Sequence, residues 1–253
     1  MPRGTPVRST QGAMELFSYH LIRAPVHQVA ARLMNSRALR AVPGLRHAEC
    51  LIPMRMGHPV LRPSRYHFTT LALFAFWNDE VSLERFLEAP PYPVFARAGW
   101  HVRMRFYRRW GTYTGLDEAT VYRDLGGSHG PVIGVTFARL KLSETFRFQR
   151  WGRPVEAQVR DHPGVIRAAV AYRPLNTFST FSVWQSEEEM LGMVHGHRTE
   201  VDGTQHRRAM VERERRPFHH EFTTMRFLPL SEHGEWPLPK DECGAPGETV
   251  RLG

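Results

Sequence analysis

The stretch from Pro163 to Trp184, PGVIRAAVAYRPLNTFSTFSVW, decides the fold. It opens with a Pro-Gly turn and contains two runs rich in β-branched and aromatic residues, Val165 to Tyr172 and Phe178 to Trp184. Runs of this kind, bounded by turn residues, predict strands. The stretch therefore predicts two successive strands, the first beginning at a Pro-Gly turn and the second ending at a tryptophan.

The same landmarks occur earlier in the chain and in the same order. Pro43-Gly44 precedes a predicted strand, and the apolar run FTTLALFAFW ends at Trp77. A third landmark, Met104-Arg105-Phe106, recurs as Met225-Arg226-Phe227. Self-similarity of this kind is the signature of an internal repeat, so the chain is expected to hold two copies of one unit.

Each copy has the order strand, helix, strand, strand, helix, strand. The first copy has predicted strands at Met14–Ile22, Leu45–Ile52, Phe68–Trp77 and Trp100–Phe106 and helices at Val26–Leu39 and Asp79–Leu87. The second has strands at Val132–Leu140, Val165–Tyr172, Phe178–Trp184 and Glu221–Leu228 and helices at Phe146–Val159 and Glu187–Val194. This is the ferredoxin-like βαββαβ order of an α+β protein.

A four-stranded antiparallel sheet with helices on one side has a second apolar face that must be buried. The other copy is the economical partner. We therefore expect the two sheets to pack face to face as an intramolecular dimeric α/β barrel, with room for a cavity between them. The expected divisions are a flexible leader (1–13), the first repeat (14–125), a linker (126–131), the second repeat (132–230) and a polar Pro/Gly-rich tail (231–253).

Composition places the chain among globular proteins. Its 253 residues are 42% hydrophobic and 11% aromatic. Apolar runs fall short of the roughly 20 residues of a transmembrane helix, and the opening MPRGTPVRSTQG lacks an apolar signal region. The two cysteines, Cys50 and Cys243, are too few for a disulfide framework. We expect a soluble, cytoplasmic protein.

The formal net charge of +9 raises the question of an anionic partner. The 34 Lys and Arg residues are spread along the whole chain, without a basic run interleaved with aromatic residues. This distribution argues against nucleic-acid binding. It favours an anionic small molecule, a carboxylate-bearing cofactor or peripheral contact with a membrane surface.

The second copy is longer than the first between its Trp and its Met-Arg-Phe landmark, and the extra length holds His195, His197 and His206. A short helix is expected there, capped by Thr204 and stopped by Pro217. Helical spacing places His206, Ala209, Met210 and Arg213 on one stripe. His206 has two interpretations from spacing alone, a hydrogen-bonded structural histidine or a ligand.

Other site interpretations were weighed. His195 and His197, with Glu200, could bind zinc or non-heme iron, but residues two apart on a helix point away from each other. Cys50 could offer a thiolate ligand, although it belongs to the copy without the insertion. The sequence has no G-x-S-x-G, P-loop or G-x-G-x-x-G motif.

Three segments carry a resemblance to a known family. They are DHPGVIRAAVAYRPLNTFSTFSVWQSEEEM, GTQHRRAM and FHHEFTTMRFLPL, all within the region from Val132 to Leu230. They resemble the spheroidene monooxygenase family of dimeric α/β-barrel proteins; FAFWNDE and RWGTYTG match more weakly between Phe68 and Gly115. The preceding HGHRTEVDGTQ is longer than the family pattern.

The resemblance implies a heme-containing oxygenase, whose best-known member acts on a carotenoid. It implies a b-type heme with His206 as the axial iron ligand and with Met210 and Arg226 beside the cofactor. Glu200 or Asp202 could orient the ligand imidazole. Candidates to pair with the propionates are Arg139, Arg147, Arg150, Arg153, Arg207 and Arg226, and candidates for the distal side are His101, His219 and His220.

The expected function is therefore that of a heme-dependent monooxygenase-like enzyme. Its substrate would be an apolar small molecule or lipid, and an external electron donor would supply reducing equivalents. Two alternatives stay open: the same heme could support dehydration, peroxidation or N–O/N–N chemistry, or the barrel could carry heme or a hydrophobic ligand without catalysis. The sequence leaves the substrate, the donor and the oligomeric state open.

Overall fold

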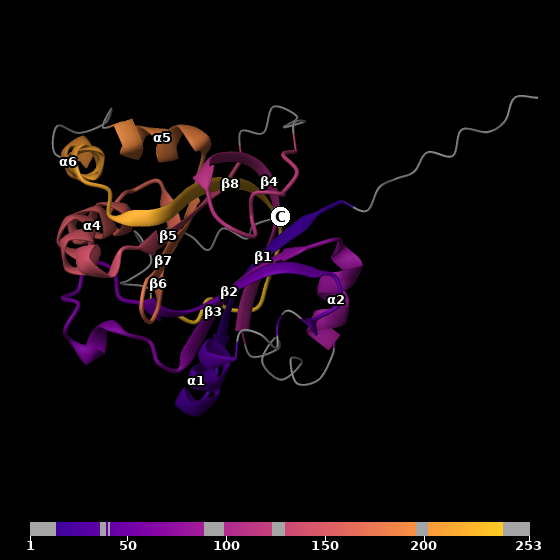
Figure 1. The fold of residues 1–253 in the computed structure, drawn as a ribbon. Helices are drawn as coiled ribbons and strands as arrows, with labels where there is room; N and C mark the ends of the chain where they lie inside the picture. The colour runs from indigo at the N-terminus through magenta and orange to yellow at the C-terminus, as the bar shows by residue number, and fades with distance from the viewer. Residues whose placement is uncertain are drawn as a thin grey trace, which may run out of the picture.

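The computed structural model describes residues 14–35, 39, 41–88, 99–122, 130–195 and 202–239, with the side chains of 195 and 202–204 excepted (Figure 1). The expected leader (1–13), most of the expected linker and the end of the expected tail (240–253) lie outside these residues.

The element order is the predicted one in both halves. The first half consists of β1 (Leu16–Arg23), α1 (Val26–Met34), β2 (Leu45–Met54), the 3₁₀ turn η2 (Pro63–Arg65), β3 (Thr70–Trp77), α2 (Glu80–Glu88) and β4 (Gly99–Thr112). The second consists of β5 (Val132–Leu140), η3 (Leu142–Glu144), α4 (Thr145–Arg160), β6 (Val165–Arg173), β7 (Thr177–Trp184), α5 (Glu187–His195), α6 (Asp202–Arg215) and β8 (His219–His233).

Local sequence explains where the helices begin and end. Asp79 caps α2, since its Oδ1 accepts hydrogen bonds from the Ser82 backbone N–H at 2.8 Å and from the Ser82 hydroxyl at 2.6 Å. The helix predicted to begin at Thr204 starts two residues earlier, at Asp202. It ends at Arg215, because Pro217 lacks the N–H that would continue the hydrogen-bond ladder.

All eight strands form one closed antiparallel barrel in the order β1-β3-β2-β6-β7-β5-β8-β4. Two seams join the halves: β4 pairs with β8 along most of its length, whereas β2 pairs with β6 only over Ile52–Met54. Closure leaves neither half with a free sheet edge. The prediction of two ferredoxin-like repeats packed as an intramolecular barrel is confirmed.

The cavity expected between the sheets is instead filled by side chains. Phe17 stacks on Phe76 with ring centroids 4.4 Å apart, and Tyr19 stacks on Phe181 at 4.2 Å. These rings come from both halves, and with aliphatic neighbours they form one buried core inside the barrel. Aromatic side chains of this volume interdigitate to the density of a normal protein interior, so the expected hollow was wrong for this space.

The C-terminal boundary also differs from the expected one at residue 231. β8 continues to His233, and the chain then crosses one end of the barrel. Leu238 joins the interior core, and the Trp236 ring packs edge-on against Trp100 at 4.6 Å. The Arg23 guanidinium donates to the Pro237 carbonyl at 3.0 Å. Residues 231–238 therefore belong to the barrel.

A buried ion pair links the β2–β3 connection of the first half to α4 of the second. Arg65 Nη2 lies 2.9 Å from Glu156 Oε1 and 3.0 Å from Glu156 Oε2. The Gly57 backbone N–H donates to the same carboxylate at 2.8 Å. With its oxygens satisfied from two sides, this pair fixes the first half on the second near the shorter seam.

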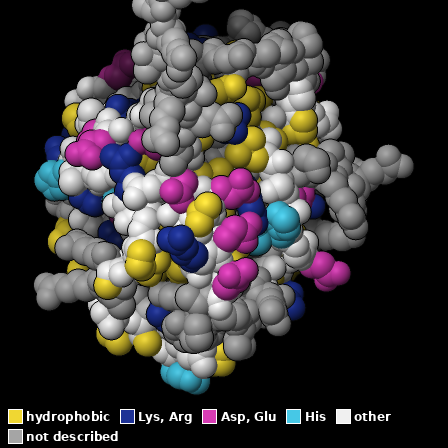
Figure 2. All heavy atoms as spheres, turned by 90° about the vertical axis from the view of Figure 1, so that its right-hand side faces the viewer, with side chains coloured by type: hydrophobic (Ala, Val, Ile, Leu, Met, Phe, Trp, Pro, Cys, Tyr) yellow, Lys and Arg dark blue, Asp and Glu magenta, His cyan; other side chains and the backbone are white. Residues whose placement is uncertain are grey.

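Charged side chains gather on the outer surface of the first half. Figure 2 shows acidic side chains grouped beside Lys and Arg on the side that carries α2. There, Arg103 of β4 pairs with Glu80 at 2.6 Å and Glu84 at 2.7 Å, both from α2. No described helix is long and apolar enough to cross a membrane.

Candidate functional site

The outer face of the second half carries a patch of small polar residues. In the strand register, Thr136 of β5 lies between Thr224 of β8 and Thr180 of β7. In the neighbouring row, Gly134 lies next to Ser182. We call these five residues the threonine face. Because side chains alternate along a strand, it lies on the opposite side of the sheet from the buried interior residues.

Helices α4, α5 and α6 border the threonine face. Phe148 of α4 packs edge-on against Phe178 at 4.9 Å. Met190 of α5 lies over Gly134, where an added Cβ would come within 3.5 Å of the Met190 sulfur. Arg213 of α6 holds its guanidinium 4.1 Å from the centre of the Phe222 ring. Even so, Thr136, Thr180 and Thr224 are half-buried, and solvent still reaches them.

Helix α6 turns the predicted stripe inward: Ala209 is buried, and His206, Met210 and Arg213 are half-buried. It packs on α4 and α5, at the left of the molecule in Figure 1. His206, Met210 and Arg213 lie at helical spacing on one side of it, and Arg213 Nη1 is 3.8 Å from the Met210 sulfur. Since Arg213 covers Phe222 of the sheet, this side of α6 turns toward β8. His206 and Met210 are both half-buried there.

Arg226 lies on the same face of the sheet but at its other end. It is buried next to Gly134 in the register and pairs with Glu187 at the start of α5. Its guanidinium is 4.4 Å from the Trp110 ring, which Arg108 also covers, at 4.5 Å. Burial raises the pKa of nearby Tyr107 to about 12, with Glu187 adding to the effect.

Most of the other predicted arginines already have protein partners. Arg139 pairs with Glu221 at 3.0 Å, and Arg147 pairs with Glu212 at 2.8 Å. Arg153 donates to the Gly57 carbonyl. Arg150 and Arg207 are exposed. Arg213, which the sequence analysis did not select as a cation for an anionic cofactor, covers Phe222 in the sheet row next to the threonines.

The predicted distal histidines divide between the halves. His219 stacks on Phe222 at 4.8 Å, at the edge of the threonine face. Burial, reinforced by Arg213 and Lys141, lowers its pKa to about 4, so its imidazole is neutral at pH 7. His220 is exposed. His101 lies on β4, where it stacks between His20 and His233 at 5.1 and 4.7 Å.

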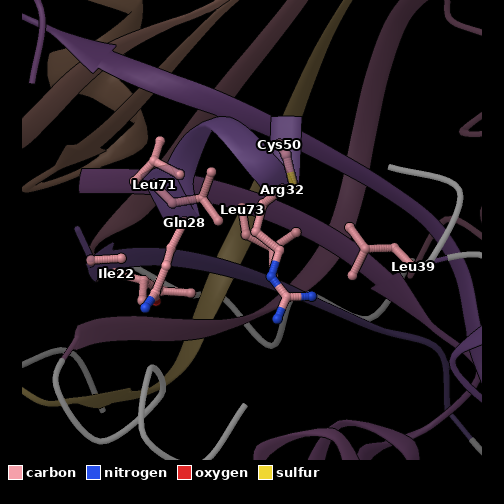
Figure 3. Close-up of a pocket in the computed structure, with 9 residues that line it drawn as sticks. Ile22, Gln28, Arg32, Leu39, Cys50, Leu71 and Leu73 are labelled. Carbon is pink, nitrogen blue, oxygen red and sulfur yellow. The ribbon is translucent and has the colours of Figure 1, made fainter. Parts of the chain in front are cut away.

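Cys50, the alternative thiolate ligand for heme iron, is buried on β2. Burial raises the pKa of the Cys50 thiol to about 12, which keeps it protonated. Figure 3 shows Cys50 with Leu71 and Leu73 facing a pocket beside α1, near Arg32. The pocket has a volume of about 20 Å³. That is room for roughly one water molecule, far too little for a heme.

The alternative metal site cannot be placed. His197, Glu200 and the side chains of His195 and Asp202 lie outside the described residues. Within the part of the chain that is described, no group of three or more His, Cys, Asp or Glu residues is arranged to hold a metal ion.

Sequence reasoning missed the threonine face itself. Its signal is present in VIGVTFARL, where Gly134 and Thr136 occupy alternate positions of an otherwise apolar strand. On a surface covered by helices, such positions usually hold larger apolar residues. Read together with Thr180 and Ser182 in TFSTFSVW, the alternation marks one face of two neighbouring strands.

No protein-family model matches the chain. Over 244 residues it is 29% identical to a spheroidene monooxygenase of Rubrivivax gelatinosus, covering 92% of this chain and 88% of that protein. Among solved structures, an aldoxime dehydratase in complex with butyraldoxime has a TM-score of 0.50 at 11% identity, covering 88% of this chain and 82% of that one. A second aldoxime dehydratase structure has a TM-score of 0.47 at 10% identity.

The sequence match extends over both halves of the barrel rather than the second half alone. The aldoxime dehydratase supports the fold only, because the identity is low. The resemblance inferred from the residues is thus confirmed: the chain is similar to spheroidene monooxygenase along almost its whole length, on a duplicated ferredoxin-like barrel.

Proposed function

We propose that the protein is a heme-dependent monooxygenase-like enzyme that acts on an apolar small molecule or lipid. The heme would lie against the threonine face, with His206 as the axial ligand of the iron. The similarity to spheroidene monooxygenase supports the reaction class. One observation carries the position: three neighbouring threonines stay half-exposed on a sheet face that three helices border.

The residues of this face fit a flat macrocycle. Gly134 is already covered by Ser182 and Met190, so the open part of the face is the row of Thr136, Thr180 and Thr224. Thr136 and Thr224 point their hydroxyls toward each other at 3.4 Å and so present small side chains. A planar ring can approach a surface of small residues more closely than one of Leu or Phe.

The surrounding side chains match the other parts of a heme. Arg213 provides a cation for a propionate, and its contact with Phe222 holds the guanidinium in place. Arg226 already pairs with Glu187, so it would contact the heme without supplying a free positive charge for a propionate. Met210 adds a soft apolar contact beside His206. When bound, heme iron supplies the activation of dioxygen or peroxide.

The chain's own residues would keep the reacting region apolar. Phe148, Phe178 and Phe222 cover one end of the threonine face and exclude water from it. His219 stays uncharged at neutral pH, so it can accept a hydrogen bond without bringing a positive charge into this region. These features favour an apolar substrate over a charged one.

Heme titration of the full chain tests the ligand. We expect a Soret band that His206→Ala abolishes or shifts, because the substitution removes the iron ligand. His220→Ala, on an exposed ring of the same region, is the matched control and should keep the wild-type spectrum. An unchanged spectrum in His206→Ala would overturn the assignment, and loss of the band in His219→Ala alone would move the ligand to His219.

Turnover tests the reaction class. Monooxygenation inserts one atom of dioxygen into the substrate and reduces the other to water, which consumes two electrons and two protons from an external donor. Product formation should therefore require both oxygen and a reductant. Turnover in the absence of both would contradict the monooxygenase proposal and favour dehydratase chemistry on the same barrel.

A further inference from the structure

Three large apolar side chains are exposed together at one end of the second half. Leu142 of η3 is 65% exposed, Phe146 in the first turn of α4 is 73% exposed, and Leu175 of the β6–β7 turn is 73% exposed. Their segments lie side by side, since the Leu140 backbone N–H donates to the Asn176 carbonyl at 2.7 Å. We call these three residues the apolar tip.

Leu175 is held in an unfavourable conformation. Its φ of 90° makes it the one non-glycine residue with positive φ in the described part of the chain. Leucine rarely adopts this region, and such strain gathers at functional sites. The Leu175 backbone N–H donates to the Tyr172 hydroxyl at 3.1 Å, which helps to hold the turn. The turn thus presents a leucine to solvent where glycine would be less strained.

Basic side chains surround the apolar tip. They are Lys141 just before η3, Arg150 on α4, Arg215 at the end of α6 and Arg216 just after it. The nearby carboxylates are already paired: Glu144 with Arg147 and Arg216, and Glu212 with Arg147 and Arg215. Glu214 is exposed. With Arg147 included, five cations lie near three carboxylates, those of Glu144, Glu212 and Glu214. This excess of positive charge suits an anionic surface.

An aromatic cluster that begins at Phe148 of α4 adjoins the threonine face. Phe148, two residues after Phe146, contacts Phe178 at 4.9 Å and Phe218 at 5.9 Å. The next ring is His219, which lies 6.0 Å from Phe218 and stacks on Phe222. Phe178 and Phe222 lie in the sheet row next to Thr180 and Thr224. These rings pack against one another in one apolar cluster that adjoins the proposed heme site.

We propose that the apolar tip docks on a lipid bilayer with anionic headgroups and that apolar substrate enters from the bilayer along the aromatic cluster. Side chains that enter the acyl region and cations that stay at the headgroups are the two features of proteins that lie on a membrane. The substrate route rests on the proposed function, whereas the docking surface rests on the exposed residues alone.

Vesicle flotation of the full chain, prepared without heme, tests the docking. The protein should bind vesicles of phosphatidylcholine with added phosphatidylserine, and added salt should weaken the binding. Leu142→Ser with Phe146→Ser should lower the affinity at least about tenfold, because two apolar side chains are lost from the contact. Leu175→Asn is a milder third variant, since asparagine tolerates positive φ.

The chain offers matched controls on the first half. Met34 and Leu61 are 83% and 84% exposed, and Met34→Ser and Leu61→Ser should leave vesicle binding unchanged. Equal binding by the tip variants and wild type would overturn the proposal, as would a wild type that ignores anionic vesicles. If light scattering instead shows self-association that the tip variants abolish, the tip is a protein contact. A Soret titration without vesicles reports separately on the proposed function.

Discussion

The two halves of the barrel have the same elements but different outer faces. Each has a buried tryptophan whose indole N–H donates to a serine, Trp77 to Ser18 at 2.8 Å and Trp184 to Ser182 at 2.9 Å. Leu73 of β3 and Thr180 of β7 each lie four residues before these tryptophans, so they occupy equivalent positions of the two copies. His20 pairs with Leu73 on the neighbouring strand, and Thr136 pairs with Thr180, so His20 and Thr136 are also equivalent positions.

The matched positions differ in burial. Leu73 is 2% and His20 1% exposed, whereas Thr136 and Thr180 remain half-exposed. The first half closes its outer face with large side chains, beside a small pocket at α1. Under the proposed function, this difference separates two tasks: the first half packs for stability, and the second keeps a surface open for the heme.

The largest expected effect is a loss of heme binding when the threonine face is filled with bulky side chains. Thr136→Leu with Thr180→Leu places bulky apolar side chains on the threonine face. We expect heme binding to fall at least about tenfold, because the leucines occupy space that the macrocycle needs. The Soret titration used for His206→Ala measures it. Wild-type affinity in this variant would show that the heme does not lie on the threonine face.

The reverse change should affect stability and leave ligand binding intact. Leu73→Thr removes buried apolar surface from the first half and buries a hydroxyl in its place. We expect a loss of about 2–4 kcal/mol in the free energy of unfolding, measured by urea denaturation. Heme affinity should stay at the wild-type value. A stability within about 0.5 kcal/mol of wild type would show that the first half is less tightly packed than its burial indicates.

Protonation of a column of buried histidines should destabilise the barrel. His20, His101 and His233 form a stacked column on β1, β4 and β8. Burial lowers the pKa of His101 to about 4, with His233 and Arg103 adding to the effect. It also lowers the pKa values of His20 and His233; Glu84 opposes the shift at His233.

Since the unfolded chain takes up these protons more readily, stability should fall as the pH decreases from about 6.5 to about 4. We expect a loss of about 1–3 kcal/mol over this range in urea denaturation. His101→Phe should flatten the pH dependence, and His220→Ala, on an exposed ring, should leave it unchanged. An equal slope in His101→Phe and wild type would exclude the column as its source.

The smallest effect concerns the β6–β7 turn. Leu175→Gly removes the strain of a leucine at positive φ, so we expect a gain of about 0.5–1 kcal/mol in the free energy of unfolding. Leu61→Gly, in the β2–β3 connection, changes an exposed leucine that has no such strain and should give no gain. Destabilisation by Leu175→Gly would mean that the leucine makes contacts that outweigh its strain.

Sequence patterns predicted the fold because the order of apolar and polar residues in each strand indicates which of its faces is buried. β3 is buried along its whole length, and TLALFAFW shows this directly. The paired landmarks, such as Pro43-Gly44 with Pro163-Gly164, then revealed the repeat. The filled interior could not be predicted, since alternation tells which face is apolar but not whether rings such as Phe17 and Phe76 meet across the barrel.

The candidate site was harder to predict than the fold. Helical spacing predicted a less exposed stripe on α6, and His206, Met210 and Arg213 are half-buried there; their role in a site stays a prediction. The threonine face and the histidine column depend on register between strands far apart in the sequence. Local sequence gives no register, so His20, His101 and His233 look unrelated until the strands are paired.

The shorter seam between the halves determines where the barrel yields first. β2 and β6 pair only through Ile52–Met54, and the middle residue of this seam, Pro53, has no amide hydrogen to donate. Backbone amides along β6 should therefore exchange with deuterated solvent sooner than those along β8. The buried Arg65–Glu156 ion pair lies beside this seam, so we expect it to reduce how often β2 and β6 separate.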